Sequence, residues 1–444
     1  MTSRSPVPPL RHVPPGRAVR TAGLMLTAAV LLWPVIARPT GLLPGQGVGD
    51  LVGWRALLDE GFGFTALVQT AATSQPIGED ILLLQGYPLE ALLFSPLLAA
   101  LPWPLAVNLT VWLLLGLTGL TAAALAGRLT GDGPAALVAG LAWQTTATVR
   151  IALEGAAFGV LLGLALLPLI LWTGLLALQT HDRRWAALAG GLGGLLLLLR
   201  CGGGIWLAGL LVLTTLGLIA ARRGLTLVAL LPPALVASLL VALPLLAWTE
   251  GHPVPGLPLA AIPWALLGLA LLTVSQLDPR RPRARMPLGL LGLGLLGSGL
   301  LGSGLWSAAL TLVELGALLW LAQALIGRPR LAIGSGAVLL VGWGLQWGGL
   351  PVTPWMKAAA QPGVVLVVPP EAAGALSVMT GQATHNASRP GVVTGWRMAD
   401  HLPAGMPTGT SDQWTTAQKL RAGAFGISTV VCVEGDQQVW IPVE

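Results

Sequence analysis

Residues 104–127 read PLAVNLTVWLLLGLTGLTAAALAG, and Arg128 follows directly. A bilayer core about 30 Å thick needs roughly 20 apolar residues per helix, so this stretch is long enough to cross a membrane. Hydrophobic residues make up 54% of the chain and charged residues 9%, whereas a soluble domain carries about 25% charged residues. The solvent of most of this chain is therefore lipid, and its function should lie where polar groups interrupt the apolar pattern.

Similar stretches recur along the chain. We predict about 11 membrane-spanning helices, at residues 18–37, 104–127, 134–152, 155–178, 185–199, 202–220, 225–248, 258–277, 287–304, 306–326 and 331–350.

Arginine marks alternate gaps between these spans. The N-terminal tail and the gaps on its side of the membrane hold Arg4, Arg11, Arg17, Arg20, Arg128, Arg183, Arg184, Arg222, Arg223, Arg280, Arg281, Arg283, Arg285, Arg328 and Arg330. Basic residues in short loops stay cytoplasmic. The pattern predicts an all-α polytopic transmembrane bundle with the N-terminus inside and the C-terminus outside. The net charge of +6 does not indicate a nucleic-acid partner, because these arginines lie in loops that face anionic lipid.

The chain divides into five parts by composition. We predict a cytoplasmic disordered tail, a first transmembrane helix, an extracytoplasmic loop, a transmembrane helical bundle and an extracytoplasmic α/β domain, at residues 1–17, 18–37, 38–103, 104–350 and 351–444. Strands are expected at 364–368, 427–433 and 438–443, and helices at 371–380 and 415–424.

The long outer loop contains two further helical pieces. Residues 51–62 are typical of an interfacial helix. Residues 86–103 are apolar but contain four prolines, which remove backbone donors and disturb preceding turns. If this segment spanned, every later arginine loop would lie outside. We therefore predict that it lies at the outer interface or re-enters the membrane.

Among the acidic residues of the outer loop, Asp50 is the candidate for catalysis, and Glu79, Asp80 and Glu90 are candidates for substrate binding. Asp50 follows a glycine-rich approach and either acts as a general base toward a hydroxyl or N-caps the helix that begins at residue 51. Glu79 and Asp80 are adjacent carboxylates that either bind a divalent cation or are simply solvated. Glu90 lies in the apolar 86–103 segment, where a lone carboxylate is costly. No metal centre is predicted, and no cofactor is expected apart from such a cation.

Two arginines depart from the cytoplasmic pattern. Arg150 and Arg200 lie at the outer ends of their predicted spans, where a planar guanidinium can hold a phosphate at headgroup level. The alternative for Arg150 is an ion pair with Glu154, one helical turn further on. The alternative for Arg200 is an extended side chain that reaches lipid phosphate.

The arrangement resembles the GT-C superfamily of membrane glycosyltransferases, and within it the bacterial YfhO-like proteins. The similar stretches are Gly49-Asp50, Gln75 to Gly78, Asn108 to Gly140, Glu154-Gly155, Leu166 to Leu169, Gln382 to Gly395 and Leu420 to Val433.

The resemblance implies transfer of a sugar from a polyprenyl-phosphate donor to an acceptor on the outer face of a bacterial inner membrane. In that superfamily an acidic residue of the first outer loop is the base, and Asp50 fits that position. This chain departs from the better-known members because Leu51 and Val52 follow Asp50 where a paired acidic motif would stand. The alternatives are a lipid or solute transporter or flippase, and an inactive scaffold of the same fold.

Overall fold

A computed structural model of the chain describes residues 16–45, 50–59, 89–180, 182–199, 306–347, 350, 352–354, 364–368, 427–434 and 437–442. Four predicted spans, 202–220, 225–248, 258–277 and 287–304, lie outside the described residues. The predicted helices 371–380 and 415–424 lie outside them as well.

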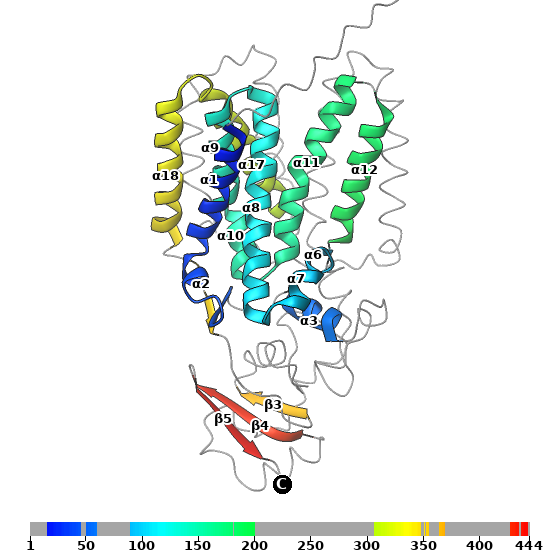
Figure 1. Cartoon of the computed structure of the whole chain (residues 1–444), viewed down its shortest axis with the longest axis vertical. Coiled ribbons are helices and arrows are strands. Elements are labelled where there is room, and N and C mark those ends of the chain that lie inside the picture. The colour runs from blue at the N-terminus through cyan, green and yellow to red at the C-terminus, as the bar shows by residue number, and fades with distance from the viewer. Residues whose placement is uncertain are drawn as a thin grey trace, which may run out of the picture.

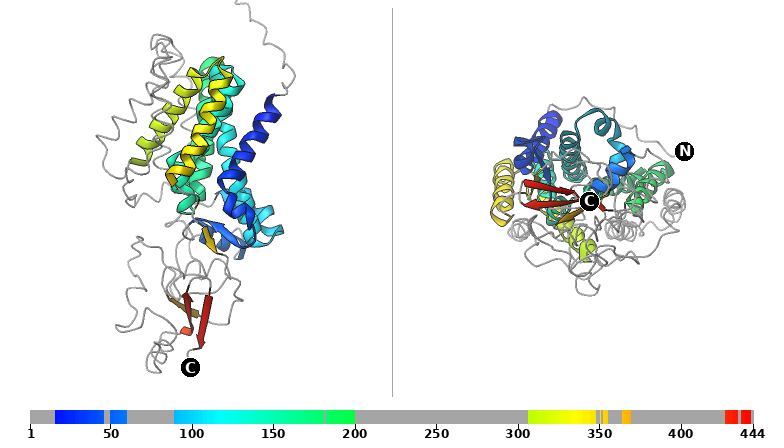
Figure 2. Two further views of the ribbon diagram at one scale, coloured as in Figure 1. Left: turned by 90° about the vertical axis from the view of Figure 1, so that its left-hand side faces the viewer. Right: turned by 90° about the horizontal axis from the view of Figure 1, so that it is seen from below.

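The described chain is mostly helical, with its long helices running side by side (Figures 1 and 2). The helices are α1 (Gly16–Leu31), α2 (Trp33–Ala37), α3 (Leu51–Asp59), α6 (Leu89–Leu93), α7 (Ser95–Ala100), α8 (Trp103–Thr130), α9 (Gly133–Gln144), α10 (Ala147–Glu154), α11 (Phe158–Thr180), α12 (Arg183–Leu198), α17 (Trp306–Ala324) and α18 (Pro329–Trp347).

Among the described residues, α8 and α11 are long and apolar enough to cross a membrane, and the bent pair α9–α10 makes a third if it forms one span. At 1.5 Å per residue, the 28 residues of α8 extend about 42 Å, more than the apolar core of a bilayer. The chain therefore has the helices of a membrane protein. The larger number of about 11 spans is a prediction that depends on residues beyond the described part.

Residues 89–103, the described part of the segment 86–103, are interrupted as the prolines suggest. Within this segment, α6 has five residues and α7 has six, and Pro102 precedes the first residue of α8. Neither short helix approaches the length needed to cross a bilayer.

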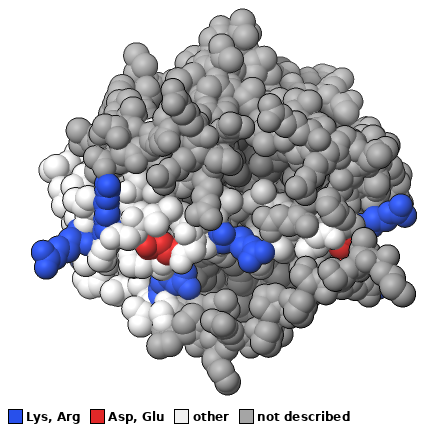
Figure 3. Space-filling model, turned by 90° about the horizontal axis from the view of Figure 1, so that it is seen from above, with Lys and Arg blue, Asp and Glu red and all other residues white. Residues whose placement is uncertain are grey.

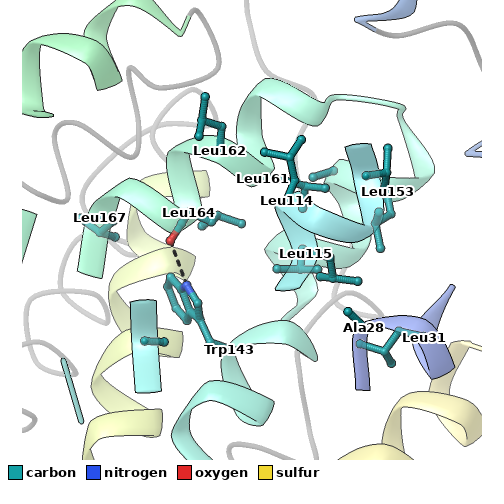
Figure 4. Close-up of a cluster of buried hydrophobic side chains, with 14 of the residues drawn as sticks. Ala28, Leu31, Leu114, Leu115, Trp143, Leu153, Leu161, Leu162, Leu164 and Leu167 are labelled. Carbon is teal, nitrogen blue, oxygen red and sulfur yellow. Dashed lines mark hydrogen bonds between the residues drawn. The ribbon is translucent and has the colours of Figure 1, made fainter. Parts of the chain in front are cut away.

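Side chains that donate to backbone carbonyls tie the helices together. Trp143 of α9 donates from Nε1 to the Leu164 carbonyl of α11 at 3.0 Å (Figure 4). Gln144 is fully buried and donates from Nε2 to the carbonyls of Leu24 and Leu115, on α1 and α8. Water cannot satisfy such groups inside a membrane, so these bonds hold the helices in a defined register.

The helix ends define two faces of the molecule. Strand β1 (Leu42–Pro44), soon after α2, pairs antiparallel with β2 (Val352–Pro354), soon after α18. The first and last described helices therefore end on the same face. On that side lies a separate sheet in which β4 (Ile427–Glu434) pairs parallel with β3 (Val364–Val368) and antiparallel with β5 (Gln437–Pro442) (Figure 1).

Arginines lie on the opposite face, here named the arginine face, which Figure 3 shows from above. They lie where α8 ends, where α12 begins and around the start of α18, at Arg128, Arg183, Arg184, Arg328 and Arg330. The positions match the alternation of basic gaps along the sequence.

Gly140 of α9 lies at a close approach to α8. A Cβ atom at this position would lie 2.6 Å from the Gly119 carbonyl oxygen and 2.9 Å from Leu24 Cδ2. A Cβ atom on Gly344 of α18 would meet no atom within 4 Å. The pair therefore separates the packing effect of a methyl group from its effect on helix propensity.

We expect Gly140→Ala to lower the free energy of unfolding by about 1–3 kcal/mol, because the backbones of α8 and α9 must separate. Gly344→Ala should be neutral or stabilising, since alanine favours the helix by about 1 kcal/mol over glycine. Thermal unfolding of both variants in the same detergent measures the difference. Equal unfolding temperatures would contradict the close approach of α8 and α9.

Candidate functional site

Asp50, directly before α3, is buried against the start of α11. Its side chain is 3% exposed, and Oδ2 accepts a hydrogen bond from the Gly159 amide at 2.7 Å. Gly159 is the second residue of α11, so its N–H is one of the donors that a helix leaves unpaired at its N-terminus. The N-terminal end of a helix favours a negative charge. The environment of Asp50 therefore stabilises its ionised carboxylate.

The backbone also fixes Asp50 in place. Its amide donates to the Ala156 carbonyl at 2.8 Å. Ala156 links α10 to α11 and has a φ of +49°, a left-handed conformation that costs a residue with a side chain about 1–2 kcal/mol. Strained positions of this kind cluster at functional sites.

Trp54 connects Asp50 to a second carboxylate. It lies one turn after Asp50 on α3, and its Nε1 donates to Glu90 Oε1 at 2.8 Å. The ring of Trp54 packs against Phe158 with centroids 5.2 Å apart. Trp54 is fully buried, so α3 packs into the core, whereas the sequence predicted a helix lying at the interface.

Glu90 lies beside Asp50 and is 1% exposed. A Cβ atom on Gly159 would lie 3.4 Å from Asp50 Oδ2 and 3.5 Å from Glu90 Oε2. Both oxygens therefore lie close to Gly159, at the start of α11. Glu90 Oε2 is buried and has no hydrogen-bond partner among the described residues. Burial, and secondly the charge of Asp50, raises the pKa of Glu90 to about 8.

The two carboxyl groups thus differ in environment although they share one site. Asp50 receives a backbone donor at a helix N-terminus, whereas one oxygen of Glu90 receives none. Pairs of carboxyl groups with such different environments divide into a proton-bearing acid and an ionised base. An ionised carboxylate beside a protonated one can act as a general base toward a hydroxyl that reaches it.

Arg150 is held within the helical bundle. Its Nε lies 2.6 Å from Glu154 Oε1. This is the ion pair that the sequence analysis gave as the alternative for Arg150. Its guanidinium also lies over the Trp343 ring of α18, 5.6 Å from the ring centroid. The other predicted substrate-binding residues Arg200, Glu79 and Asp80 lie outside the described residues, so their predicted roles are untested.

Glu314 performs a structural task at the break between α9 and α10, where the chain bends by 41°. This fully buried residue of α17 accepts at Oε1 from the Ala147 amide at 2.7 Å and at Oε2 from Thr148 Oγ1 at 2.7 Å. Its carboxylate therefore satisfies the first donors of α10 within the helical layer.

Sequence reasoning found Asp50 and Glu90 separately but missed their connection. Trp54 carried one available signal, because residues four apart lie on the same side of a helix. Gly159 carried none, since nothing local in the sequence indicates which helix end faces the loop.

Within the described ranges, no group of three or more His, Cys, Asp and Glu side chains is arranged to hold a metal ion. Comparison of the chain with protein-family models and with curated protein sequences finds no match.

Gly45 lies in close contact with the end of α10. Its φ is +97°, and a Cβ there would lie 2.6 Å from the Leu153 carbonyl oxygen and 3.0 Å from that of Glu154. Gly131, between α8 and α9, has a φ of +71° but open space around its Cβ position. Both glycines adopt the left-handed conformation, and only Gly45 is crowded.

We expect Gly131→Ala to cost about 1–2 kcal/mol through backbone strain alone. Gly45→Ala should cost a further 1–3 kcal/mol, approximately, because the loop must move away from the end of α10. Unfolding temperatures in detergent compare the two variants. If Gly45→Ala is no worse than Gly131→Ala, the loop does not pack on α10 as described.

Proposed function

We propose that this chain is an integral membrane glycosyltransferase that transfers a sugar from a polyprenyl-phosphate donor to an acceptor hydroxyl on the outer face of a bacterial inner membrane. The observation that carries the proposal is the buried Asp50–Glu90 pair at the N-terminus of α11. A carboxylate held there by the Gly159 amide has the chemistry of a general base.

In the proposed reaction, Asp50 accepts the proton of the acceptor hydroxyl while the hydroxyl oxygen attacks the anomeric carbon of the sugar. The bond from that carbon to the donor phosphate breaks, and the polyprenyl phosphate leaves with the bonding electrons. Water would compete with the acceptor as a nucleophile. The burial of both carboxyl groups fits a site that excludes it.

The remaining parts of the site follow from the sequence and belong to the same proposal. Arg150 and Arg200 bind the donor phosphate, for which a guanidinium is well suited. The helical bundle binds the polyprenyl chain. Glu79, Asp80 and Glu90 take part in substrate binding, and the C-terminal α/β domain covers or selects the acceptor.

The topology proposed is about 11 spans, with the N-terminus in the cytoplasm and the C-terminal domain outside. The pairing of β1 with β2 supports an odd number of spans, because it brings the ends of the first and last helices to one face. The arginines of the opposite face (Figure 3) support a cytoplasmic assignment for that face.

We expect a phosphatase reporter fused after Glu444 to be active, because it requires an extracytoplasmic location. The same reporter fused after Arg128 or Arg328 should be inactive, since both residues lie on the arginine face. An active reporter after Arg328 together with an inactive one after Glu444 would show that the topology is inverted. Asp50 would then lie on the cytoplasmic side.

We expect Asp50→Asn to reduce sugar transfer by about 10²–10⁴, the usual contribution of a general base. Asparagine keeps the size of the side chain and caps a helix about as well as aspartate, so the unfolding temperature should change little. Asp182→Asn is the matched control, because Asp182 is an exposed N-cap of α12, on the arginine face. Transfer from a radiolabelled polyprenyl-phosphate sugar is the measurement. Full activity in Asp50→Asn would contradict the proposed mechanism.

One observation favours a second candidate, a transporter or flippase. Transporters use helices broken at the middle of the membrane, and α9–α10 is such a broken pair, capped by Glu314. Lipid or solute movement across vesicles that contain the wild-type protein, undiminished by Asp50→Asn, would favour this candidate over transfer.

A further inference from the structure

We propose that Glu90 carries a proton in the working protein, so that Asp50 and Glu90 form an acid–carboxylate pair with a single negative charge. The inference deepens the proposed transfer reaction and rests on it. It makes Glu90 the residue that determines the charge of the site, whereas Asp50 is the base.

The hydrogen bonds assign the proton to Glu90. Asp50 Oδ2 accepts from the Gly159 amide at 2.7 Å, at a helix N-terminus that favours an anion. Glu90 accepts at Oε1 from Trp54, and its Oε2 has no partner in the described part of the chain. A buried charge that is only partly hydrogen-bonded costs far more than a buried neutral group. A carboxylic acid whose carbonyl oxygen is Oε1 and whose hydroxyl oxygen is Oε2 fits this geometry.

The charged groups of the neighbouring described elements do not neutralise an ionised Glu90. Of the described elements packed against α6, neither α7 nor α11 contains a titratable residue. The α3 helix carries Arg55 and Asp59. The guanidinium of Arg55 lies over the Trp103 ring, 5.6 Å from its centroid, and the Asp59 side chain lies outside the described residues. Asp50 is the group that acts on Glu90, and its negative charge favours the protonated form.

The single charge matters for the donor. A polyprenyl-phosphate sugar is itself anionic, so each additional carboxylate at the site repels it. Glu90 keeps its proton while Asp50 takes one from the acceptor hydroxyl. Loss of the Glu90 proton at alkaline pH would place a second negative charge beside Asp50.

The test compares Glu90→Gln with Asp50→Asn, because glutamine has the shape of a protonated glutamate and still accepts from Trp54. We expect Glu90→Gln to lose less than about tenfold in transfer, well short of the 10²–10⁴ expected for a lost base. Wild-type activity should fall as the pH rises through about 8, and Glu90→Gln should lack that fall. A loss in Glu90→Gln as large as in Asp50→Asn would overturn the proposal.

A spectroscopic measurement makes the test independent of activity. Infrared spectra of the full-length protein in detergent at neutral pH should contain a C=O band from a protonated carboxylic acid that Glu90→Gln removes and Asp182→Asn retains. The band should disappear as the pH rises through about 8. Absence of a band assigned to Glu90 would overturn the proposal even where no transfer is detected. A band without any transfer would support the acid–carboxylate pair and count against the proposed function alone.

Discussion

The structure depends on one constraint: a lipid environment offers no hydrogen bonds, so the protein must satisfy its own buried polar groups. Helices satisfy the backbone, and a few side chains satisfy what remains between helices. Gln144 joins α9 to α1 and α8, and Glu314 caps the start of α10. Against this background, the oxygen of Glu90 without a donor is conspicuous. Of the buried side-chain atoms without a hydrogen-bond partner among the described residues, it is the only carboxylate oxygen.

The segment that follows α2 is fixed to the bundle by the same kind of bond. Asn108 of α8 donates from Nδ2 to the carbonyls of Pro39 and Leu42, at 2.7 and 2.8 Å. The strand that follows is paired with β2, and Gly45 brings the chain against the end of α10. Asp50 is fixed separately, because its amide donates to the Ala156 carbonyl. The position of the proposed base is therefore determined by backbone contacts on several helices, which is the rigidity that a proton transfer requires.

The two candidate functions use different parts of this frame. Transfer chemistry needs the carboxyl pair at the end of α11, whereas transport would need the broken α9–α10 pair in the middle of the helical layer. Glu314 already bonds to two amides and a hydroxyl at that break, so its carboxylate is occupied by a structural task. The unpartnered carboxylate oxygen lies on Glu90, at the end of the bundle where α11 begins.

Composition and the spacing of arginines were sufficient to predict a helical membrane protein, the interruption at residues 86–103, and strands at 364–368 and 427–433. These features depend on local chain length, proline and hydrophobicity, which a sequence displays directly. Asp50 and Glu90 were also identified singly, because carboxylates in apolar surroundings are conspicuous. Their proximity, the bridge through Trp54 and the bond to Gly159 were decided by tertiary structure alone. Residues 50, 90 and 159 are distant along the chain, and only the packing of α3 and α6 on α11 determines which helix terminus they share.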